Sequence, residues 1–359
     1  MIKRLFSCAL LGVILVSCAP SHYKLTGSVW GFDEGDTVCL YKVGNIIPLG
    51  SSVVKDGKFT FQGKQDSTIL ASLRTMINGK PKKITLPFFL ENGKLIVKGD
   101  SMDCSVTGSI HNDIYQKYQN ERKEYILEWA DLSPFTMTNE QRKTYNERIK
   151  EIDSIMSSIN RRYLEANLDN PVGLKLFPTT IKEYDIKKQQ ELTEHFHALW
   201  PEDKFITKHK ERVETQMKTL VGELFTDYSM QTPDGKRVSL SEYVSKNKYT
   251  LVDIWASWCT PYPAQKTRLV EAYQKYKDKG LEIVGVSIDT DKAAWTSAIK
   301  EWGMPWPQIS DLKGWKSQAT QLYYIENIPY RILIDQNGII VGRNIQSKEL
   351  DAVLEKFLK

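Results

Sequence analysis

The sequence predicts an α/β domain at the C-terminal end of the chain, preceded by a small antiparallel β domain and a helical connector. Three changes in the spacing of apolar residues indicate this order. Residues 18–110 alternate apolar and polar positions between glycine turns, which is typical of strands. Residues 111–220 repeat apolar positions at helical spacing, and residues 221–359 alternate strand-like with helix-like segments. A chain of 359 residues is long enough for these separate cores.

The composition is that of a globular protein with charges spread along the chain. Hydrophobic residues make up 41% and charged residues 26% of the sequence. The 49 basic residues exceed the 44 acidic ones and give a formal net charge of +5. The basic residues form no stripe interleaved with aromatic side chains, so nucleic acid is not an expected partner.

Residues 1–17 are expected to be a signal peptide rather than part of the fold. Two basic residues precede the apolar run Leu5–Val16, which is too short to span a bilayer stably. The run ends in Leu15-Val-Ser-Cys18, which resembles a bacterial lipobox. The resemblance implies cleavage before Cys18 and lipidation of its thiol, giving an envelope lipoprotein that is anchored to the membrane and faces the periplasm. An ordinary signal peptide followed by a chance cysteine is the alternative.

Three cysteines are left once the signal peptide and the lipidated residue are set aside, namely Cys39, Cys104 and Cys259. The cell envelope permits disulfides. The odd number allows either a Cys39–Cys104 bridge with an unbridged Cys259, or three thiols. Cys39 and Cys104 lie in apolar, strand-like segments, which favours two buried thiols over a bridge.

Residues 18–110 are expected to fold as a sandwich-like β domain. Turn signals such as Asp56-Gly57 and Asn92-Gly93 separate the apolar runs. This region shows no cluster of metal-binding residues and no pair of carboxylates that would indicate a chemical site. The predicted strands are Leu25–Trp30, Thr37–Tyr41, Gly57–Phe61 and Lys94–Val97.

Residues 111–220 are expected to connect the two end domains through amphipathic helices. The predicted helices are Asp113–Ala130, Asn139–Leu168, Lys187–Trp200 and Lys204–Val221. Their predicted boundaries are Pro134, Asn170-Pro171, Pro178 and Pro201. His195 and His197 lie two residues apart on one helix and therefore point to different faces. Neither a metal nor another cofactor is expected.

Residues 221–359 are expected to form a central sheet covered by helices, because strand and helix signals alternate. The predicted strands are Leu251–Trp255, Leu281–Ser287, Arg331–Asp335 and Ile339–Gly342. The predicted helices are residues 263–279, Ala293–Trp302, Lys316–Leu322 and Lys348–Leu358. The segment Trp255-Ala-Ser-Trp-Cys259-Thr-Pro-Tyr262 joins the first strand to the first helix. This context places Cys259 at a helix N-terminus, where unpaired N–H groups and the helix dipole favour the thiolate and argue against an inert, buried thiol.

Five motifs follow one another in this last third of the chain. They are Gly222-Glu-Leu-Phe-Thr-Asp, Asp234-Gly-Lys-Arg-Val-Ser-Leu-Ser241, Val252-Asp-Ile-Trp-Ala-Ser-Trp-Cys259, Val284-Gly-Val-Ser-Ile-Asp289 and Ile325-Glu-Asn-Ile-Pro329. Together they resemble the thioredoxin superfamily, most closely the membrane-anchored thiol–disulfide oxidoreductases of the TlpA/ResA type. The resemblance covers residues 222–359 and implies a thioredoxin-like fold.

The N-terminal domain carries a resemblance of its own. Its motifs are Val54-Lys-Asp-Gly-Lys-Phe-Thr-Phe61, Phe88-Phe-Leu-Glu-Asn-Gly-Lys-Leu-Ile-Val97, and Val106-Thr-Gly-Ser109 followed by Asn112-Asp113. They resemble an uncharacterised β domain that precedes thioredoxin domains in Bacteroides-type envelope lipoproteins. This resemblance implies no chemistry.

The thioredoxin resemblance implies roles for individual residues. Cys259 matches the attacking cysteine, and Trp258 matches the aromatic residue packed beside it. Asp253 matches a buried acid that helps to move the proton during exchange. Pro329, after Ile328, matches a cis-proline whose neighbouring backbone pairs with the incoming peptide.

The departures from the family pattern are concentrated just after Cys259. Tyr262 stands where the resolving cysteine would be, in a position next to the bound substrate. Pro263 and Gln265 replace the usual arginine and glutamate, and Thr267 replaces a proline. These changes imply altered chemistry rather than that of a complete dithiol reductase.

The leading hypothesis is therefore single-thiol disulfide exchange through Cys259, in envelope thiol redox homeostasis. Its expected partners are protein thiols or disulfides of the envelope and an external thiol reductant. One alternative is a non-enzymatic module that binds a peptide or protein. Another is a peroxiredoxin-like antioxidant, whose Pro-x-x-x-Thr-x-x-Cys pattern would require proline at Val252 and threonine at Ala256.

Overall fold

A computed structural model describes residues 20–30, 32–77, 80–84, 87–100, 104–132, 138–260 and 262–358. The predicted signal peptide and Cys18 lie outside these described residues. The chain divides into two compact units, Met1–Glu183 and Tyr184–Lys359. Each unit has its own arrangement of helices and strands.

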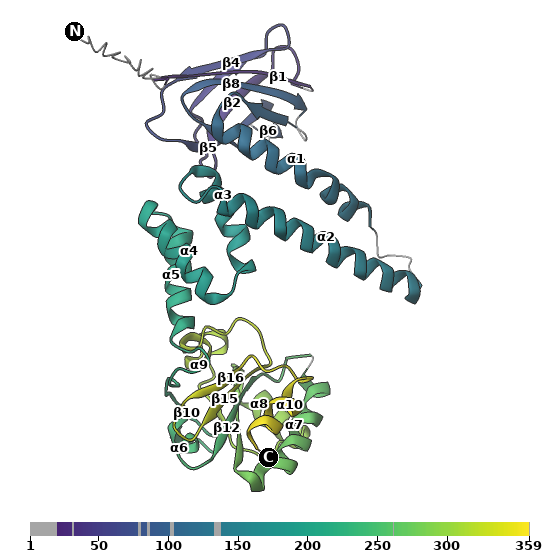
Figure 1. Cartoon of the computed structure of the whole chain (residues 1–359), viewed down its shortest axis with the longest axis vertical. Coiled ribbons are helices and arrows are strands. Elements are labelled where there is room, and N and C mark those ends of the chain that lie inside the picture. The colour runs from purple at the N-terminus through teal and green to yellow at the C-terminus, as the bar shows by residue number, and fades with distance from the viewer. Residues whose placement is uncertain are drawn as a thin grey trace, which may run out of the picture. The chain divides into compact units, whose positions relative to one another are not determined.

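The first unit begins with two β-sheets that share one apolar core (Figure 1). One sheet has the strand order β4-β1-β8-β9, and the other has the order β3-β2-β5-β6 with β7 paired to β5. All pairs are antiparallel except β1 with β8. The strands are β1 (Tyr23–Trp30), β2 (Thr37–Lys42), β3 (Gly50–Val53), β4 (Phe59–Gly63), β5 (Ile69–Ile77), β6 (Lys80–Ile84), β7 (Phe88–Leu90), β8 (Gly93–Asp100) and β9 (Cys104–Thr107). The predicted N-terminal β region is confirmed.

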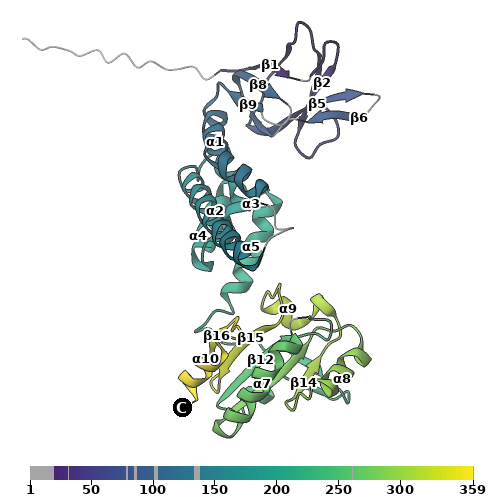
Figure 2. The same ribbon diagram turned by 90° about the vertical axis from the view of Figure 1, so that its right-hand side faces the viewer.

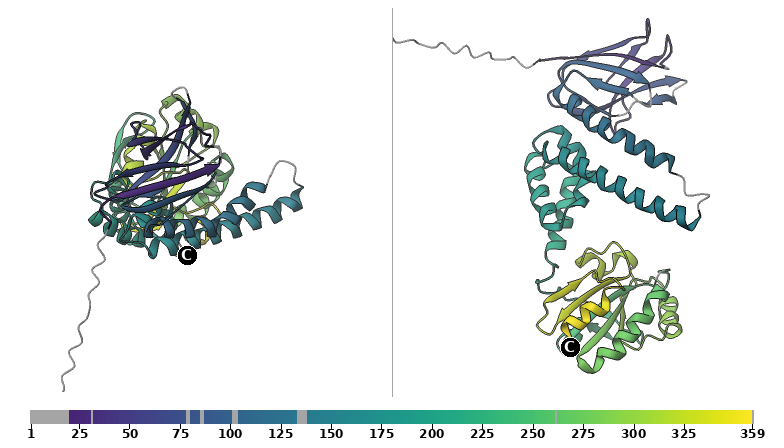
Figure 3. Two further views of the ribbon diagram at one scale, coloured as in Figure 1. Left: turned by 90° about the horizontal axis from the view of Figure 1, so that it is seen from above. Right: turned by 45° about the vertical axis from the view of Figure 1, so that its right-hand side comes forward.

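Two long helices then run side by side in opposite directions, as Figure 3 shows. They are α1 (Ile110–Asp131) and α2 (Asn139–Glu165). The buried Tyr118 hydroxyl of α1 donates to the Asn160 Oδ1 of α2 at 2.9 Å, which satisfies both polar groups inside the helix pair. The shorter α3 (Pro171–Thr180) and the 3-10 turn η1 (Ile181–Glu183) complete this unit.

Helix α3 differs from the prediction, which made Pro178 a boundary between elements. Asn170 caps the helix, because its Oδ1 accepts the backbone N–H of Val172 at 2.9 Å, and Pro171 occupies the first turn. Pro178 lies inside the helix, two residues before its end at Thr180. A proline at this place has no N–H to donate to the preceding turn, and the full burial of neighbouring Phe177 contributes stabilisation against that loss.

The second unit starts with the helices α4 (Ile186–Leu199) and α5 (Lys204–Met217), followed by a seven-stranded sheet (Figure 2). The strand order is β11-β10-β14-β13-β12-β15-β16. The strands are β10 (Ser229–Gln231), β11 (Arg237–Ser239), β12 (Tyr249–Trp255), β13 (Leu281–Ser287), β14 (Gln308–Ser310), β15 (Tyr330–Asp335) and β16 (Ile340–Arg343). The helical elements are α6 (Ser241–Val244), α7 (Tyr262–Tyr276), η2 (Lys277–Lys279), α8 (Lys292–Glu301), η3 (Gly314–Lys316), α9 (Gln318–Leu322) and α10 (Leu350–Phe357).

Strand β12 lies inside the sheet, parallel to β13 and antiparallel to β15. Every residue from Thr250 to Trp255 is buried, as its nearly continuous apolar sequence predicts for a strand covered on both faces. Leu269, Ala272 and Tyr276 of α7 belong to the same core. The predicted α/β domain is confirmed, and β12 leads directly into the segment that carries Cys259.

Candidate active site

Cys259 lies in the short segment between β12 and α7, so the thiol is close to the start of a helix as the sequence predicts. Its side chain points inward and the residue is only 5% exposed. The thiol Sγ donates a hydrogen bond to the carbonyl oxygen of Ile328 at 3.6 Å. The sequence-based expectation that Cys259 would not be buried is therefore wrong. The reason is that this segment turns the thiol towards the loop that precedes β15, while Trp258 takes the exposed position.

The loop that faces Cys259 contains the peptide bond between Ile328 and Pro329, which is cis. Both residues are partly exposed. The structure thus brings together the thiol and the Ile328–Pro329 pair, which are far apart in the sequence. The Ile328 carbonyl is the backbone group that contacts the thiol.

Asp253 is fully buried in β12, and its partner is a residue that the sequence analysis did not assign to the site. Arg331 of β15 donates from Nε to Asp253 Oδ1 at 2.9 Å, and the two side chains are 1% and 0% exposed. The two residues are directly opposite each other in the antiparallel β12–β15 pair. Only the register of that pair identifies Arg331, because nothing in its local sequence distinguishes it from a surface arginine at a strand start.

The Arg331 guanidinium also joins the sheet to α7 and to the segment before α10. It donates to Ser347 Oγ at 3.0 Å and to Gln265 Oε1 at 3.3 Å. The Ser347 hydroxyl donates to the same Gln265 oxygen at 2.5 Å. Gln265 is one of the departures from the family pattern. Because its amide is neutral, Asp253 is the carboxylate that balances the charge of Arg331 in this cluster.

A second buried carboxylate, Asp289, holds the segment that precedes Cys259. It accepts the backbone N–H of Ser257 at 3.1 Å and the Ser257 hydroxyl at 2.6 Å. The Ser287 hydroxyl adds a third bond at 2.7 Å. Asp289 belongs to one of the five sequence motifs, but only the structure reveals its hydrogen bonds to Ser257, in the segment before Cys259.

The loop that carries the cis bond is also held by Arg343 of β16. The guanidinium donates to the carbonyls of Gln216 and Thr219, each at 3.1 Å, and to the carbonyl of Tyr323. Its Nε donates to the Tyr330 hydroxyl at 2.7 Å. Burial raises the pKa of Tyr330, although Arg343 opposes the shift, so the phenol stays protonated at neutral pH. Arg343 thereby links the C-terminal end of α5 to Tyr323 and Tyr330, the two ends of residues 323–330.

The side chain of Tyr262 lies outside the described part of the structure, which shows only that α7 starts at this residue. Residues 184–359 contain no other cysteine than Cys259. Within the described ranges no disulfide is present, and Cys39, Cys104 and Cys259 are all buried. This agrees with the favoured prediction of two buried thiols in the N-terminal region.

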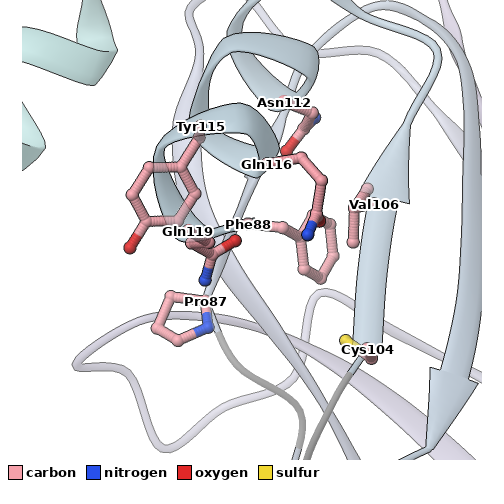
Figure 4. Close-up of a pocket in the computed structure, with 8 residues that line it drawn as sticks. All are labelled: Pro87, Phe88, Cys104, Val106, Asn112, Tyr115, Gln116 and Gln119. Carbon is pink, nitrogen blue, oxygen red and sulfur yellow. The ribbon is translucent and has the colours of Figure 1, made fainter. Parts of the chain in front are cut away.

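Cys104 lines a pocket in the first unit together with side chains of α1 (Figure 4). Tyr115, Gln116 and Gln119 come from the helix, and Cys104 starts β9. Across the residues that the structure describes, no group of three or more His, Cys, Asp or Glu side chains could hold a metal ion. The same residues include no helix that combines the length and the apolarity needed to cross a bilayer.

Family profiles match both parts of the chain, and solved structures match a share of it. The AhpC/TSA family profile matches residues 221–343, and the domain of unknown function DUF4369 matches residues 23–115. A thiol-disulfide oxidoreductase from Bacteroides fragilis is 33% identical, covers 38% of this chain and 100% of its own, and has a TM-score of 0.36. The thioredoxin domain of a thiol-disulfide oxidoreductase from Bacteroides vulgatus is 31% identical over 39% of this chain and 99% of its own, with a TM-score of 0.37.

Curated relatives match a similar share of the chain. The chain is 31% identical over 144 residues to the thiol-disulfide oxidoreductase ResA of Bacillus anthracis, which corresponds to 40% of this chain and 79% of that protein. It is 30% identical over 143 residues to ResA of a Bacillus cereus strain, or 39% of this chain and 80% of that protein. The fold and the thiol beside the cis-proline loop are those of a thioredoxin-like thiol–disulfide oxidoreductase. The chain belongs to the ResA family of these proteins.

Proposed function

We propose that the protein performs disulfide exchange with Cys259 as a single thiol and that it acts in thiol redox homeostasis of the cell envelope. The observation that carries the proposal is the 3.6 Å contact between Cys259 Sγ and the carbonyl of Ile328, next to the cis bond to Pro329. The contact supports the proposal because a peptide backbone that pairs with this loop would bring its own disulfide close to the Cys259 sulfur.

The exchange needs no cofactor. Deprotonated Cys259 attacks one sulfur of a substrate disulfide, a new S–S bond forms, and the other sulfur leaves as a thiolate with the electron pair of the broken bond. Because residues 184–359 hold no second cysteine, an external thiol must then attack the mixed disulfide and restore Cys259. The partners are accordingly protein thiols or disulfides and a thiol reductant.

The remaining site residues act around this step. Ile328 and Pro329 would align the substrate backbone, and Trp258 would contact the substrate from the exposed side. Tyr262 would occupy the place of a resolving thiol without its chemistry. Asp253 is the proposed group for proton movement, although its ion pair with Arg331 is a competing use of the same carboxylate.

The test is to incubate the full chain with glutathione disulfide at neutral pH and to locate the adducts by peptide mapping. We expect an adduct on Cys259 that dithiothreitol removes, formed slowly because the residue is 5% exposed. The Cys259→Ser variant should lack it, whereas the Cys104→Ser variant should keep it. Adducts on Cys39 or Cys104 with none on Cys259 would reject thiol exchange and favour the non-enzymatic binding module.

A thiol antioxidant is the second candidate, since the matching family profile is that of AhpC/TSA. The Cys259 thiolate would attack one oxygen of hydrogen peroxide, forming an S–O bond and a sulfenic acid, while the O–O bond breaks and the other oxygen leaves as hydroxide. Val252 and Ala256 stand where the peroxide-binding proline and threonine would be, and both are buried. We therefore expect the full chain and the Cys259→Ser variant to consume hydrogen peroxide equally slowly.

The proposed location is the periplasmic side of the envelope, with lipidated Cys18 as the membrane anchor. Its support is the apolar run followed by Leu15-Val-Ser-Cys18. The Cys18→Ser variant should move from the detergent phase to the aqueous phase of a detergent extract, or stay uncleaved. Partitioning of the unaltered protein into the aqueous phase, as for the variant, would reject the anchor.

A further inference from the structure

Two tryptophan rings are exposed in contact with each other beside the thiol. Trp258 directly precedes Cys259, and Trp315 belongs to the turn η3. Their ring centroids are 6.2 Å apart with an interplanar angle of 56°. The residues are 54% and 43% exposed, so each ring keeps a large apolar surface in water. Scattered apolar side chains need no explanation, but two adjoining indoles next to a reactive group form a specific surface.

The backbone under each ring is held in place. Ser257, before Trp258, is bonded to buried Asp289 through both its N–H and its hydroxyl. The carbonyl of Trp315 accepts the Thr320 hydroxyl at 2.9 Å and the Gln321 amide at 2.8 Å. A surface that is ordered before binding loses little conformational entropy when a ligand covers it. The aromatic pair is therefore suited to binding rather than to filling space.

We propose that Trp258 and Trp315 form a subsite for a bulky apolar side chain that flanks the cysteine of a polypeptide substrate. The inference rests on the proposed exchange at Cys259 and specifies its substrate class. The occupant is a polypeptide because Trp258 directly precedes Cys259, whose thiol contacts the Ile328 carbonyl beside the cis bond to Pro329. Aromatic rings offer such a side chain apolar area and stacking contacts, and tryptophan is enriched among the residues that dominate interface energies.

The proposal predicts selectivity between peptides that differ at one residue. The probes are two synthetic peptides with Phe or Ser next to a single cysteine, which is joined by a disulfide to 5-thio-2-nitrobenzoate. The Cys259 sulfur forms a disulfide with the peptide cysteine, and thionitrobenzoate leaves with the electron pair of the broken bond, which its absorbance reports. We expect the full chain to react about tenfold faster with the Phe peptide, which corresponds to about 1.4 kcal/mol.

Matched variants assign that selectivity to the aromatic pair. Trp315→Ala should bring the ratio of the two rates close to one, whereas Trp315→Phe should keep most of it. Trp129→Ala is the control, because Trp129 of α1 lies in the first unit and is as exposed as Trp258, at 54%. This variant should leave the ratio of the two rates unchanged. Rates of the Cys259→Ser variant are subtracted to remove reaction at Cys39 and Cys104.

The outcomes separate this proposal from the proposed function. Equal rates with the two peptides, or a ratio that survives in both Trp315 variants, would overturn the subsite while leaving exchange at Cys259 intact. Reaction of Trp315→Ala with the small disulfide 5,5′-dithiobis(2-nitrobenzoate) at the unaltered rate shows that its thiol site is undamaged. Failure of Cys259 to react with any of the three disulfides would instead overturn the exchange itself, and the subsite with it.

Discussion

The two buried carboxylates near Cys259 are satisfied in opposite ways. Asp253 in β12 faces a full positive charge, the guanidinium of Arg331. Asp289, after β13, accepts bonds only from the Ser257 N–H and from the hydroxyls of Ser257 and Ser287 among the contacts described above. The charge of Asp253 is balanced by an opposite charge, whereas the charge of Asp289 is stabilised by neutral N–H and O–H donors.

This difference determines what each carboxylate does for the site. The ion pair fixes the strand β15, and through Gln265 it ties the sheet to α7. Removing one member would leave an uncompensated charge in the core, which costs far more than the pair contributes. Asp289 instead shapes the segment before Cys259, where removing its charge weakens hydrogen bonds without stranding a partner charge.

The largest expected effect is that of Asp253→Asn. It leaves the Arg331 guanidinium buried without its counter-charge and should lower the free energy of unfolding by about 3–5 kcal/mol in urea denaturation. The double variant Asp253→Asn with Arg331→Met should recover most of the loss. A single variant as stable as the unchanged protein would show that the ion pair is not the group that holds this part of the core.

A smaller effect is expected for Asp289→Asn. An amide has one acceptor oxygen and no charge, so the bonds from Ser257 and Ser287 weaken, at a cost of about 1.5–3 kcal/mol in the same denaturation experiment. The segment before Cys259 should loosen, and iodoacetamide should label Cys259 faster. Ser239→Ala, which removes a hydroxyl bonded to Ser229 at the edge of the sheet, serves as the control for labelling. An unaltered rate of Cys259 labelling in Asp289→Asn would contradict the role of Asp289 in holding the segment before Cys259.

The smallest expected effect is that of Arg343→Lys. Arg343 is the cationic counterpart of Asp289, since carbonyls and a phenol surround its charge. Lysine keeps the charge but cannot reach all four acceptors from one planar group, so the loss should be about 1 kcal/mol. Amide hydrogen exchange should rise in residues 323–330 while the interior of β12 stays protected. Uniform exchange across the second unit would contradict a local role.

The sequence by itself determined the features that depend on local patterns. The buried strand that ends at Trp255, the amphipathic run after Cys259 and the order of motifs up to Pro329 identify the thioredoxin-like domain. Period-two and helical spacing likewise indicate the β region and the long helices. These features are readable because each one repeats within a few residues, at the scale on which backbone geometry sets side-chain direction.

Only the tertiary structure decided which distant side chains meet at the thiol. Asp253 and Arg331 are separated by 78 positions and become partners through the register of two antiparallel strands. The burial of Cys259 against Ile328 and the contact of Trp258 with Trp315 likewise join separate segments. No local pattern encodes these contacts, because strand register and loop packing are set by the whole core. A one-residue shift of the β12–β15 register would turn Asp253 or Arg331 to the opposite face of the sheet.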